Sequence, residues 1–418
     1  MTTTLPPRVI ALGALAVLLV LGGPALAGPG SDQEVGQEFR LTPADLPPPG
    51  ATESVSNGAE TIARPPDATL RVPPGFAVNL FADGLGHARW MVVAENGDVF
   101  LAQPRQERVS ILRDADGDGR AELVRTFLDG MAGPHGLAIH DGYLYVADVL
   151  GIWRVPYQTG DERARAEPEP VTAAGAFGGT RGHWTRNVVF TPDGARFFVA
   201  IGSRDNVGEE DPPRATVQVF DADGGGQRTF AAGLRNPVGI AFHPETRELY
   251  VVVNERDGLG DGLVPDYLTR IEDGDFYGWP YAYSGPNPDP DYGARRPDLV
   301  AATKVPDVLF ESHSAPLGLA FYNADRFPAE YRGDAFVALH GSWNKSKPTG
   351  YKIVRVPFES GRPTGVYRNF AVGFWLRGEA TAEVWGRPAG LAIAKDGSLL
   401  VADDAGGAIW RIAYVGAP

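Results

Sequence analysis

The sequence predicts an all-β fold, a six-bladed β-propeller, and three observations support that prediction. A phrase consisting of a turn, an apolar strand, an Asp-Gly-type turn and a second apolar strand occurs six times, at residues 90–103, 134–148, 186–203, 237–254, 316–341 and 388–403. The copies are about 60 residues apart, enough for four strands and their loops. No segment has a sustained 3.6-residue period of apolar side chains. Radial repetition closes such a protein without long exposed sheet edges.

Each copy contains two strand-length runs rich in Val, Ile, Tyr and Phe on either side of a turn, which indicates a hairpin. Ile-Trp-Arg follows the second and the last copies, at 152–154 and 409–411, and predicts a third strand. We expect the strand near 76–81 to close the ring by pairing with the last blade around 408–413. The longer gaps, near 257–307 and 341–383, predict insertions on one face, often the binding face.

The chain before the repeats divides into two segments. Residues 1–27 predict a secretory signal peptide, because Arg8 precedes an apolar run at 9–23 and Ala25-Leu26-Ala27 resembles a cleavage site. An uncleaved anchor is the alternative, but the run is short for a bilayer span. Residues 28–66 are rich in Pro and Gly and predict a disordered linker. Residues 67–418 are assigned to the propeller, exported to the periplasm or secreted, with no membrane span after cleavage.

Composition excludes several function classes. The formal charge of −14 argues against a general affinity for nucleic acid or anionic membranes. The chain has no Cys, which excludes disulfides, thiolate metal sites and a cysteine nucleophile.

Charged and polar residues stand where several repeats begin, at positions that converge on one end of a propeller channel. They are His135, His183, Arg235, Asn236 and Arg387. Together they predict a pocket that binds an anion and accepts a proton. The alternative for each residue alone is capping of its own strand or a salt bridge to a neighbouring loop.

These phrases carry a resemblance to a known family. The motifs 182–184 (Gly-His-Trp), 233–237 (Gly-Leu-Arg-Asn-Pro) and 276–280 (Phe-Tyr-Gly-Trp-Pro), with the late Arg387, resemble the soluble glucose/sorbosone dehydrogenases. The motifs 253–257 and 340–344 resemble the sorbosone-dehydrogenase-like branch most. Members of the family are periplasmic six-bladed propellers that use pyrroloquinoline quinone and calcium. The resemblance covers about residues 69 to 415.

The resemblance implies roles for individual residues. His183 matches the general base, and Arg235 matches the arginine beside the quinone carbonyls. The implied cofactor-binding residues are Arg235, Asn236, Asn254, Trp343, Lys345 and Arg387, and the implied calcium ligands are the main-chain carbonyls of Glu255 and Arg256. An anionic planar quinone needs cationic side chains and an aromatic ledge, in agreement with these residue types.

Two departures from the family pattern concern the substrate. The family supports its base histidine with an Asp, but here Ser203 follows Ile201-Gly202, and Asp205 is the candidate replacement. Asn254-Glu255-Arg256 replaces a Gln-Gly-Pro of the glucose-oxidising members. Both changes argue against glucose itself.

An acidic loop gives a separate signal. Asp114, Asp116 and Asp118 resemble the start of a calcium loop, but position 12 would be Arg125 instead of Glu. The pattern is more typical of a solvated turn.

The sequence therefore predicts an exported oxidoreductase that oxidises a sugar or a related alcohol or aldehyde with bound pyrroloquinoline quinone and Ca²⁺, and passes electrons to an external acceptor. One alternative is a calcium-dependent, lactonase-like propeller hydrolase, which would need several carboxylates at the channel. The other is a non-catalytic propeller that binds quinone or glycan. His313 and His340 are further candidates for the pocket.

Overall fold

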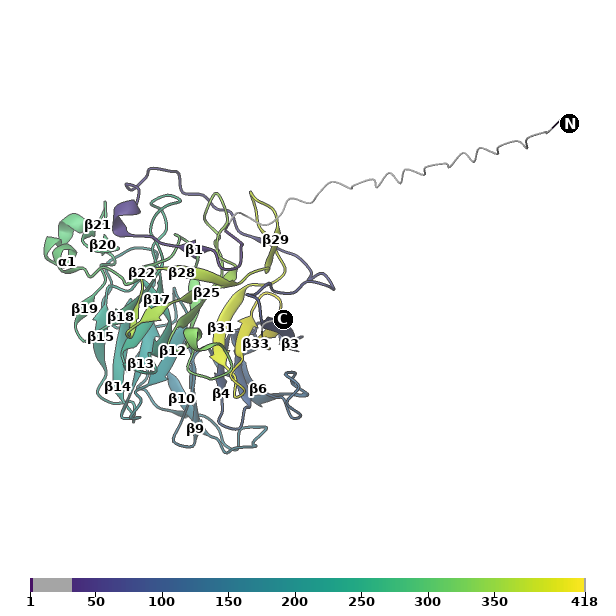
Figure 1. Cartoon of the computed structure of the whole chain (residues 1–418). Helices are drawn as coiled ribbons and strands as arrows, with labels where there is room; N and C mark the ends of the chain where they lie inside the picture. The colour runs from purple at the N-terminus through teal and green to yellow at the C-terminus, as the bar shows by residue number, and fades with distance from the viewer. Residues whose placement is uncertain (3–31, 417–418) are drawn as a thin grey trace.

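The structure, a computed structural model, consists mainly of antiparallel β-sheets and describes residues 1–2 and 32–416 (Figure 1). Six of its sheets have four or five strands each. Three of them are formed by β4 Trp90–Val93, β5 Val99–Gln103, β6 Arg108–Arg113 and β7 Leu123–Leu128; by β8 Leu137–His140, β9 Tyr143–Ala147, β10 Ile152–Pro156 and β11 Glu169–Pro170; and by β12 Arg186–Phe190, β13 Arg196–Ile201, β14 Thr216–Asp221, β15 Arg228–Ala232 and β19 Asp275–Phe276. The other three are formed by β16 Asn236–Phe242, β17 Leu249–Asn254, β18 Tyr267–Ile271 and β22 Val308–Leu309; by β23 Pro316–Phe321, β24 Ala335–Leu339, β25 Lys352–Val356, β28 Tyr367–Ala371 and β1 Glu38–Phe39; and by β31 Pro388–Ile393, β32 Leu399–Asp403, β33 Ala408–Tyr414 and β3 Phe76–Ala82.

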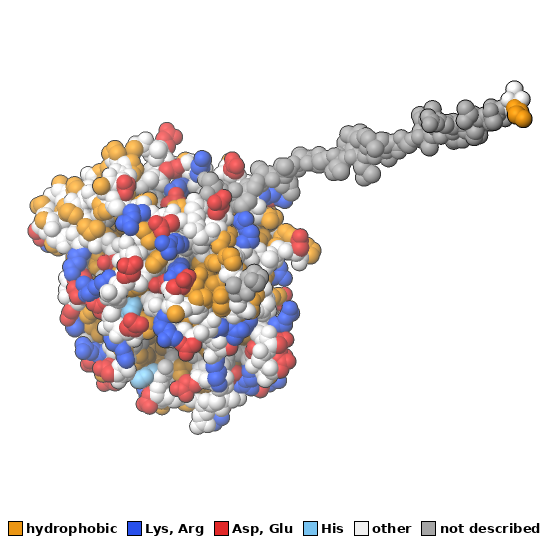
Figure 2. All heavy atoms as spheres, viewed as in Figure 1, with side chains coloured by type: hydrophobic (Ala, Val, Ile, Leu, Met, Phe, Trp, Pro, Cys, Tyr) orange, Lys and Arg blue, Asp and Glu red, His pale blue; other side chains and the backbone are white. Residues whose placement is uncertain are grey.

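Short elements lie in the connections between these sheets. They are the sheet of β2 Glu60–Thr61, β29 Trp375–Arg377 and β30 Glu383–Val384, the hairpins β20 Ala282–Tyr283 with β21 Asn287–Pro288 and β26 Phe358–Glu359 with β27 Arg362–Pro363, the helix α1 Pro297–Ala302, and the 3-10 turns η1 Pro43–Asp45, η2 Pro104–Gln106, η3 Gly293–Arg295 and η4 Ala329–Tyr331. In the part of the chain that the structure describes, no helix has the length and apolar character needed to cross a membrane. Figure 2 shows basic and acidic side chains interspersed over the visible face.

The first strands of the six sheets contact one another in cyclic order. The contacts run from β4 through β8, β12, β16 and β23 to β31, and β31 contacts β4 again. This arrangement is typical of a β-propeller. A repeated glycine permits the close approach of neighbouring sheets, because a Cβ at Gly318 would lie only 2.3 Å from the carbonyl oxygen of Ala389. The glycines at equivalent places in other repeats, Gly136, Gly239 and Gly390, face the backbone of a neighbouring strand in the same way.

Pairing between the two ends of the repeat region is confirmed. β3 pairs with β33 antiparallel, with Phe76 opposite Tyr414 and Val78 opposite Ile412. The core lies between the sheets, and every residue of β5 and β24 is buried. Strands that are apolar on both faces are expected where sheets pack against neighbours on both sides.

The segment 32–66, which we call the leader, corrects the prediction of a disordered linker. β1 pairs with β28, and β2 runs parallel to β30. Asp32 forms an ion pair of 2.9 Å with the buried Lys352. Main-chain and side-chain hydrogen bonds, with ion pairs such as that of Glu38 with Arg368, hold the leader to the sheets, and such contacts leave no hydrophobic periodicity in the sequence. Residues 28–31 of the predicted linker, and all of the predicted signal peptide except residues 1–2, lie outside the described residues.

Candidate functional site

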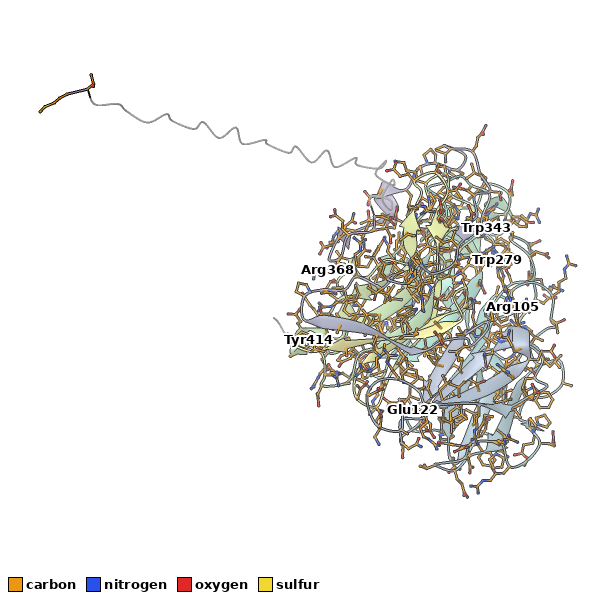
Figure 3. All side chains as sticks on the ribbon, turned by 90° about the vertical axis from the view of Figure 1, so that its right-hand side faces the viewer. Arg105, Glu122, Trp279, Trp343, Arg368 and Tyr414 are labelled. Atoms are coloured by element: carbon orange, nitrogen blue, oxygen red, sulfur yellow. The ribbon has the colours of Figure 1, made fainter. Side chains whose placement is uncertain are left out.

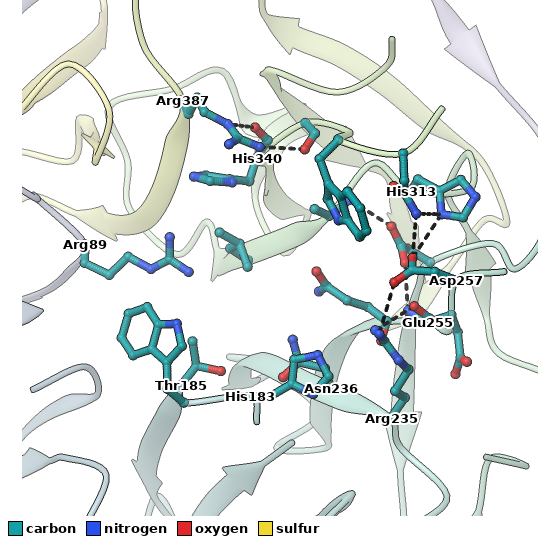
Figure 4. Close-up of a pocket in the computed structure, with 18 residues that line it drawn as sticks. Arg89, His183, Thr185, Arg235, Asn236, Glu255, Asp257, His313, His340 and Arg387 are labelled. Atoms are coloured by element: carbon teal, nitrogen blue, oxygen red, sulfur yellow. Dashed lines mark hydrogen bonds and ion pairs between the residues drawn. The ribbon is translucent and has the colours of Figure 1, made fainter. Parts of the chain in front are cut away.

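A cavity of about 400 Å³ lies where loops between the sheets converge (Figure 4). It brings together seven of the residues predicted for the site and leaves out Lys345, Arg256 and His135; the seven are His183, Arg235, Asn236, Asn254, Glu255, Trp343 and Arg387. His183 precedes β12, Arg235 precedes β16, and Arg387 precedes β31, while Asn254 ends β17. Residues at these repeat boundaries therefore line one cavity.

His183 is the group in this cavity best suited to accept a proton. Its ring Nδ1 lies 3.0 Å from both the carbonyl oxygen and the hydroxyl oxygen of Ser203. The carbonyl oxygen can only accept, so Nδ1 carries the proton and Nε2 keeps its lone pair. Burial, together with the charge of Arg235, lowers the pKa of His183 to about 3. The imidazole is therefore neutral at ordinary pH.

Ser203, and not the side chain of Asp205, supports His183. The Ser203 hydroxyl donates to the main-chain oxygen of Asp205 at 2.7 Å and so presents its lone pairs to the histidine. The carboxylate of Asp205 instead pairs with the exposed Arg181 at 3.4 Å. The predicted replacement by Asp205 is wrong for its side chain, because the carboxylate points toward solvent.

The glycine between β13 and Ser203 keeps the part of the cavity beside His183 compact. A Cβ at Gly202 would lie 2.4 Å from Oδ1 of Asn236 and 2.7 Å from Cβ of His183. Only glycine at this position allows Asn236 and His183 to approach each other so closely.

Arg235 is fixed by a dense set of contacts. Its Nη1 donates to the carbonyl oxygen of Glu255 at 2.7 Å, and its Nε donates to the carbonyl oxygen of Asn206 at 2.9 Å. Its Nη2 lies 3.3 Å from the Asp257 carboxylate. A guanidinium held from three sides offers a fixed positive charge at little further entropic cost.

Arg387 lies at the other end of the cavity, beside a second charged cluster. It donates to the carbonyl oxygens of His340 and Gly341 at 3.0 and 2.7 Å. His340 in turn binds Asp404 at 2.8 Å, and Arg89 forms an ion pair with the same carboxylate. Although burial opposes its charge, His340 and Arg89 lower the pKa of Asp404. Burial and the neighbouring Arg387 lower the pKa of His340 to about 4.

Three buried polar atoms of the cavity lining have no hydrogen-bond partner among residues 1–2 and 32–416. They are Oγ1 of Thr185, Oδ1 of Asn236 and Oε1 of Glu255. Buried polar atoms in native proteins normally have partners, so a group of unsatisfied atoms in one cavity indicates a polar ligand. Two of the three are side-chain oxygens of the kind that calcium prefers.

Sequence reasoning missed two carboxyl groups in the cavity lining, Asp257 and Asp266. Burial raises the pKa of Asp266 to about 6 and that of Glu255 to about 8. Asp257 is the last residue of the quoted motif 253–257 and could have been found from it. Asp266 lies in the longer gap after β17, where no motif distinguishes it from a solvated turn.

Lys345 and Arg256, both predicted for the site, lie outside this cavity. Lys345 lines a neighbouring cavity of about 300 Å³, and its Nζ lies 3.7 Å from Glu311. The side chain of Arg256 is buried in an ion pair with Asp289. Loop lengths differ between repeats, so adjacency in sequence to Trp343 and Glu255 does not bring these side chains into the same space.

The other histidines considered are divided between the cavity and the core. His313 and His340 line the cavity, as proposed. His135 is fully buried, and its Nδ1 lies 2.9 Å from Oδ1 of Asn187.

The acidic loop lies apart from the cavity. The carboxylates of Asp114, Asp116, Asp118 and Glu122 lie within 4.8 Å of one another. Figure 3 shows Glu122 well away from Trp343 at the cavity rim. Glu122, and not Arg125, completes this cluster.

Comparisons with known proteins agree with this site. A family model described as TrAA12-like matches residues 70–264 and 298–415. The chain belongs to the TrAA12-like family. The predicted resemblance to soluble quinone-dependent sugar dehydrogenases is thereby confirmed at the level of the family.

This TrAA12-like chain is similar in sequence to two relatives and similar in fold to two solved structures. It is 28% identical over 372 residues to an uncharacterized protein of Borreliella burgdorferi, covering 86% of this chain and 94% of that protein. It is 27% identical over 340 residues to a pyrroloquinoline quinone-dependent pyranose dehydrogenase of Coprinopsis cinerea, covering 70% of this chain and 45% of that enzyme.

The solved structures show the shared fold. The PQQ domain of the Coprinopsis cinerea pyranose dehydrogenase, in its holo form, superposes with a TM-score of 0.70 at 21% identity, covering 85% of this chain and all of that one. A Trichoderma reesei enzyme of family AA12 gives a TM-score of 0.67 at 20% identity, with the same coverage.

Proposed function

We propose that this chain is an exported sugar dehydrogenase that uses pyrroloquinoline quinone, with its six larger sheets as the six blades of the propeller. The observation that carries the proposal is His183, a neutral imidazole whose Nδ1–H is held by Ser203 and whose Nε2 is left to accept a proton. A histidine that removes a hydroxyl proton must be neutral and must have a free lone pair. Family membership and the cationic cavity support the same reading.

The residues of the cavity fit the implied quinone. When bound, that group would supply the hydride acceptor for oxidation of a carbinol or aldehyde hydrate. Arg235 and Arg387 would balance its carboxylates, and the half-exposed indole of Trp343 would cover its ring face. Asn236, Asn254 and Thr185 would hydrogen-bond its polar edge. Lys345 does not take part in this arrangement, because it lies in the neighbouring cavity.

The calcium ligands differ from those that the family resemblance implies. Nη1 of Arg235 already donates to the main-chain oxygen of Glu255, and a guanidinium at 2.7 Å disfavours a cation on the same oxygen. The unsatisfied Oε1 of Glu255 and Oδ1 of Asn236 are hard oxygen ligands within the cavity lining. We therefore propose these side-chain oxygens as calcium ligands in place of the carbonyl of Glu255.

A hydrolase is the second candidate. The three carboxyl groups of Glu255, Asp257 and Asp266 line the cavity, where the sequence alone suggested mainly Arg, His and Asn. A lactonase-like hydrolase would need carboxylates of this kind at the channel. The deep, neutral His183 favours proton abstraction from a hydroxyl over this alternative.

Reconstitution tests the proposal. Purified protein is loaded with pyrroloquinoline quinone and Ca²⁺, quinone binding is followed by absorbance and calorimetry, and reduction of an artificial dye is measured with a panel of aldoses, ketoaldoses and sugar alcohols. Sugar-dependent dye reduction that His183→Ala abolishes is expected. Lactone hydrolysis by the calcium-loaded protein without quinone would favour the hydrolase, and quinone binding without either reaction would favour a binding protein. An external electron acceptor and export are also proposals. Fractionation of the host would test export.

A further inference from the structure

Asn57 in the leader connects the 343–346 loop, which carries the cavity residue Trp343, with the turn at residues 380–381. Its main-chain N–H donates to the carbonyl oxygen of Trp343 at 2.7 Å. Its side-chain Nδ2 donates to the carbonyl oxygens of Lys345 and Ala380 at 2.9 and 2.7 Å. The hydroxyl of Thr381 donates to Oδ1 of Asn57 at 2.9 Å. One side chain thus satisfies backbone groups of the 343–346 loop and of the 380–381 turn.

The preceding part of the leader contacts a second loop that contributes to the cavity, residues 257–264. Leu46 packs against an apolar cluster that includes Leu259. The N–H of Gly50 donates to the carbonyl oxygen of Leu259 at 2.9 Å, and Oγ1 of Thr52 accepts from the N–H of Asp261 at 2.8 Å. The leader therefore contacts both loops that carry the cavity side chains at this end.

Trp343 needs this support, because its own side chain is poorly packed. The indole is 52% exposed although it lines the cavity. An aromatic side chain with half its surface in water gains less from burial than a fully buried one, so backbone contacts contribute more to fixing its loop. The hydrogen bond from Asn57 to the carbonyl oxygen of Trp343 acts on the backbone of the same residue.

We propose that the leader braces the cavity rim and that Asn57 is the positioning residue that holds Trp343 in place for the cofactor. The matched family region begins at residue 70, so this brace is formed by a part of the chain outside it. The effect on cofactor binding rests on the function proposed above, whereas the effect on the loop does not. If the loss of Asn57 leaves the rim ordered a tenth of the time, the apparent quinone affinity falls about tenfold.

The test compares Asn57→Ala with Thr42→Ala. Thr42 bonds to Asp45 within the leader and therefore serves as the matched control. Trypsin cleavage after Lys345, located by mass spectrometry, reports the order of the loop without any cofactor. Calorimetry reports quinone affinity. We expect Asn57→Ala to be cut at least severalfold faster than Thr42→Ala and to bind quinone about tenfold more weakly, with affinity affected more than turnover at saturating quinone.

Each outcome decides the question. Asn57→Ala keeps the main-chain bond to Trp343 and removes the side-chain bonds to Lys345 and Ala380. Equal cleavage rates in Asn57→Ala and Thr42→Ala would therefore overturn bracing by the Asn57 side chain, whether or not quinone binds. Faster cleavage with unchanged quinone affinity would overturn the positioning role. If the wild-type protein takes up no quinone, the proposed function fails, but the cleavage rates still test the brace. If Asn57→Ala does not fold, Thr381→Val, which removes one bond to Asn57, should show a smaller increase in cleavage, and no increase would contradict the brace.

Discussion

Replacing Ser203 by alanine should reduce sugar oxidation only about fivefold, although Ser203 stands where the family has a supporting aspartate. Nδ1 of His183 is shared between two acceptors of the same residue, the carbonyl oxygen and the hydroxyl oxygen, each at 3.0 Å. Alanine removes the hydroxyl and keeps the carbonyl. The loss of one such hydrogen bond costs about 1 kcal/mol, which corresponds to about a fivefold effect.

The assay is steady-state dye reduction by the quinone- and calcium-loaded protein, with His183→Ala as the reference for complete loss of the base. That reference should lose roughly 10²- to 10⁴-fold in turnover, the usual contribution of a positioned proton acceptor. Ser398→Ala is the matched control, because Ser398 is a buried serine whose hydroxyl binds Asp396 in the turn between β31 and β32, away from the His183 site.

Two results would refute this reasoning. A loss in Ser203→Ala as large as that in His183→Ala would mean that the carbonyl oxygen does not maintain the tautomer. A Ser203→Ala enzyme indistinguishable from Ser398→Ala would mean that the hydroxyl contributes nothing to catalysis. Quinone affinity and melting temperature, measured on the same samples, separate both results from unfolding.

Three further predictions follow from the same cavity. The acid limb of kcat/KM should lie near pH 3 and not near 6.5, because burial and Arg235 lower the pKa of His183, and a pH profile of the loaded enzyme checks this. Arg387→Ala should weaken quinone binding roughly tenfold to a hundredfold in calorimetry, through loss of a charge-assisted bond, whereas Arg368→Ala, an exposed pair with Glu38, should have no effect. Burial raises the pKa of Glu255 from 4.5 to about 8, so its contribution to the stability of the apoprotein is complete below pH 4.5 and is lost as the pH rises through 8. Melting curves should show this loss in the wild type, its reversal by Ca²⁺, and neither effect in Glu255→Gln; a calcium response retained in Glu255→Gln would contradict the assigned ligand.

Strand repetition made the sheets and much of the site predictable. Each sheet begins with the same apolar phrase, so the residues that precede these strands, such as His183, Arg235 and Arg387, must converge when the sheets surround one axis. The pairing of β3 with β33 was predictable for a similar reason, because a ring of sheets joins its two chain ends. Site residues whose positions are set by the repeat could therefore be predicted from the sequence.

Site residues whose positions are set by loops could not be predicted in this way. Lys345 is two residues from Trp343, yet the backbone between them turns its side chain toward Glu311 and a different cavity. Asp266 reaches the cavity from the gap after β17. Its carboxylate accepts hydrogen bonds from the main-chain N–H groups of Glu255 and Ala315. These partners are distant in sequence, so no local pattern identifies them.

The leader shows why composition misled the prediction of order. Proline and glycine remove the periodicity that indicates helices and strands, and a chain without periodicity resembles a disordered linker. The leader nevertheless needs no core of its own, because loops of the propeller rim leave main-chain N–H and C=O groups that its backbone and Asn57 can satisfy. Its order is thus a property of the surface on which it lies. An extended segment next to long insertions should therefore be checked for contacts with the loops of the site before it is assigned as a flexible linker.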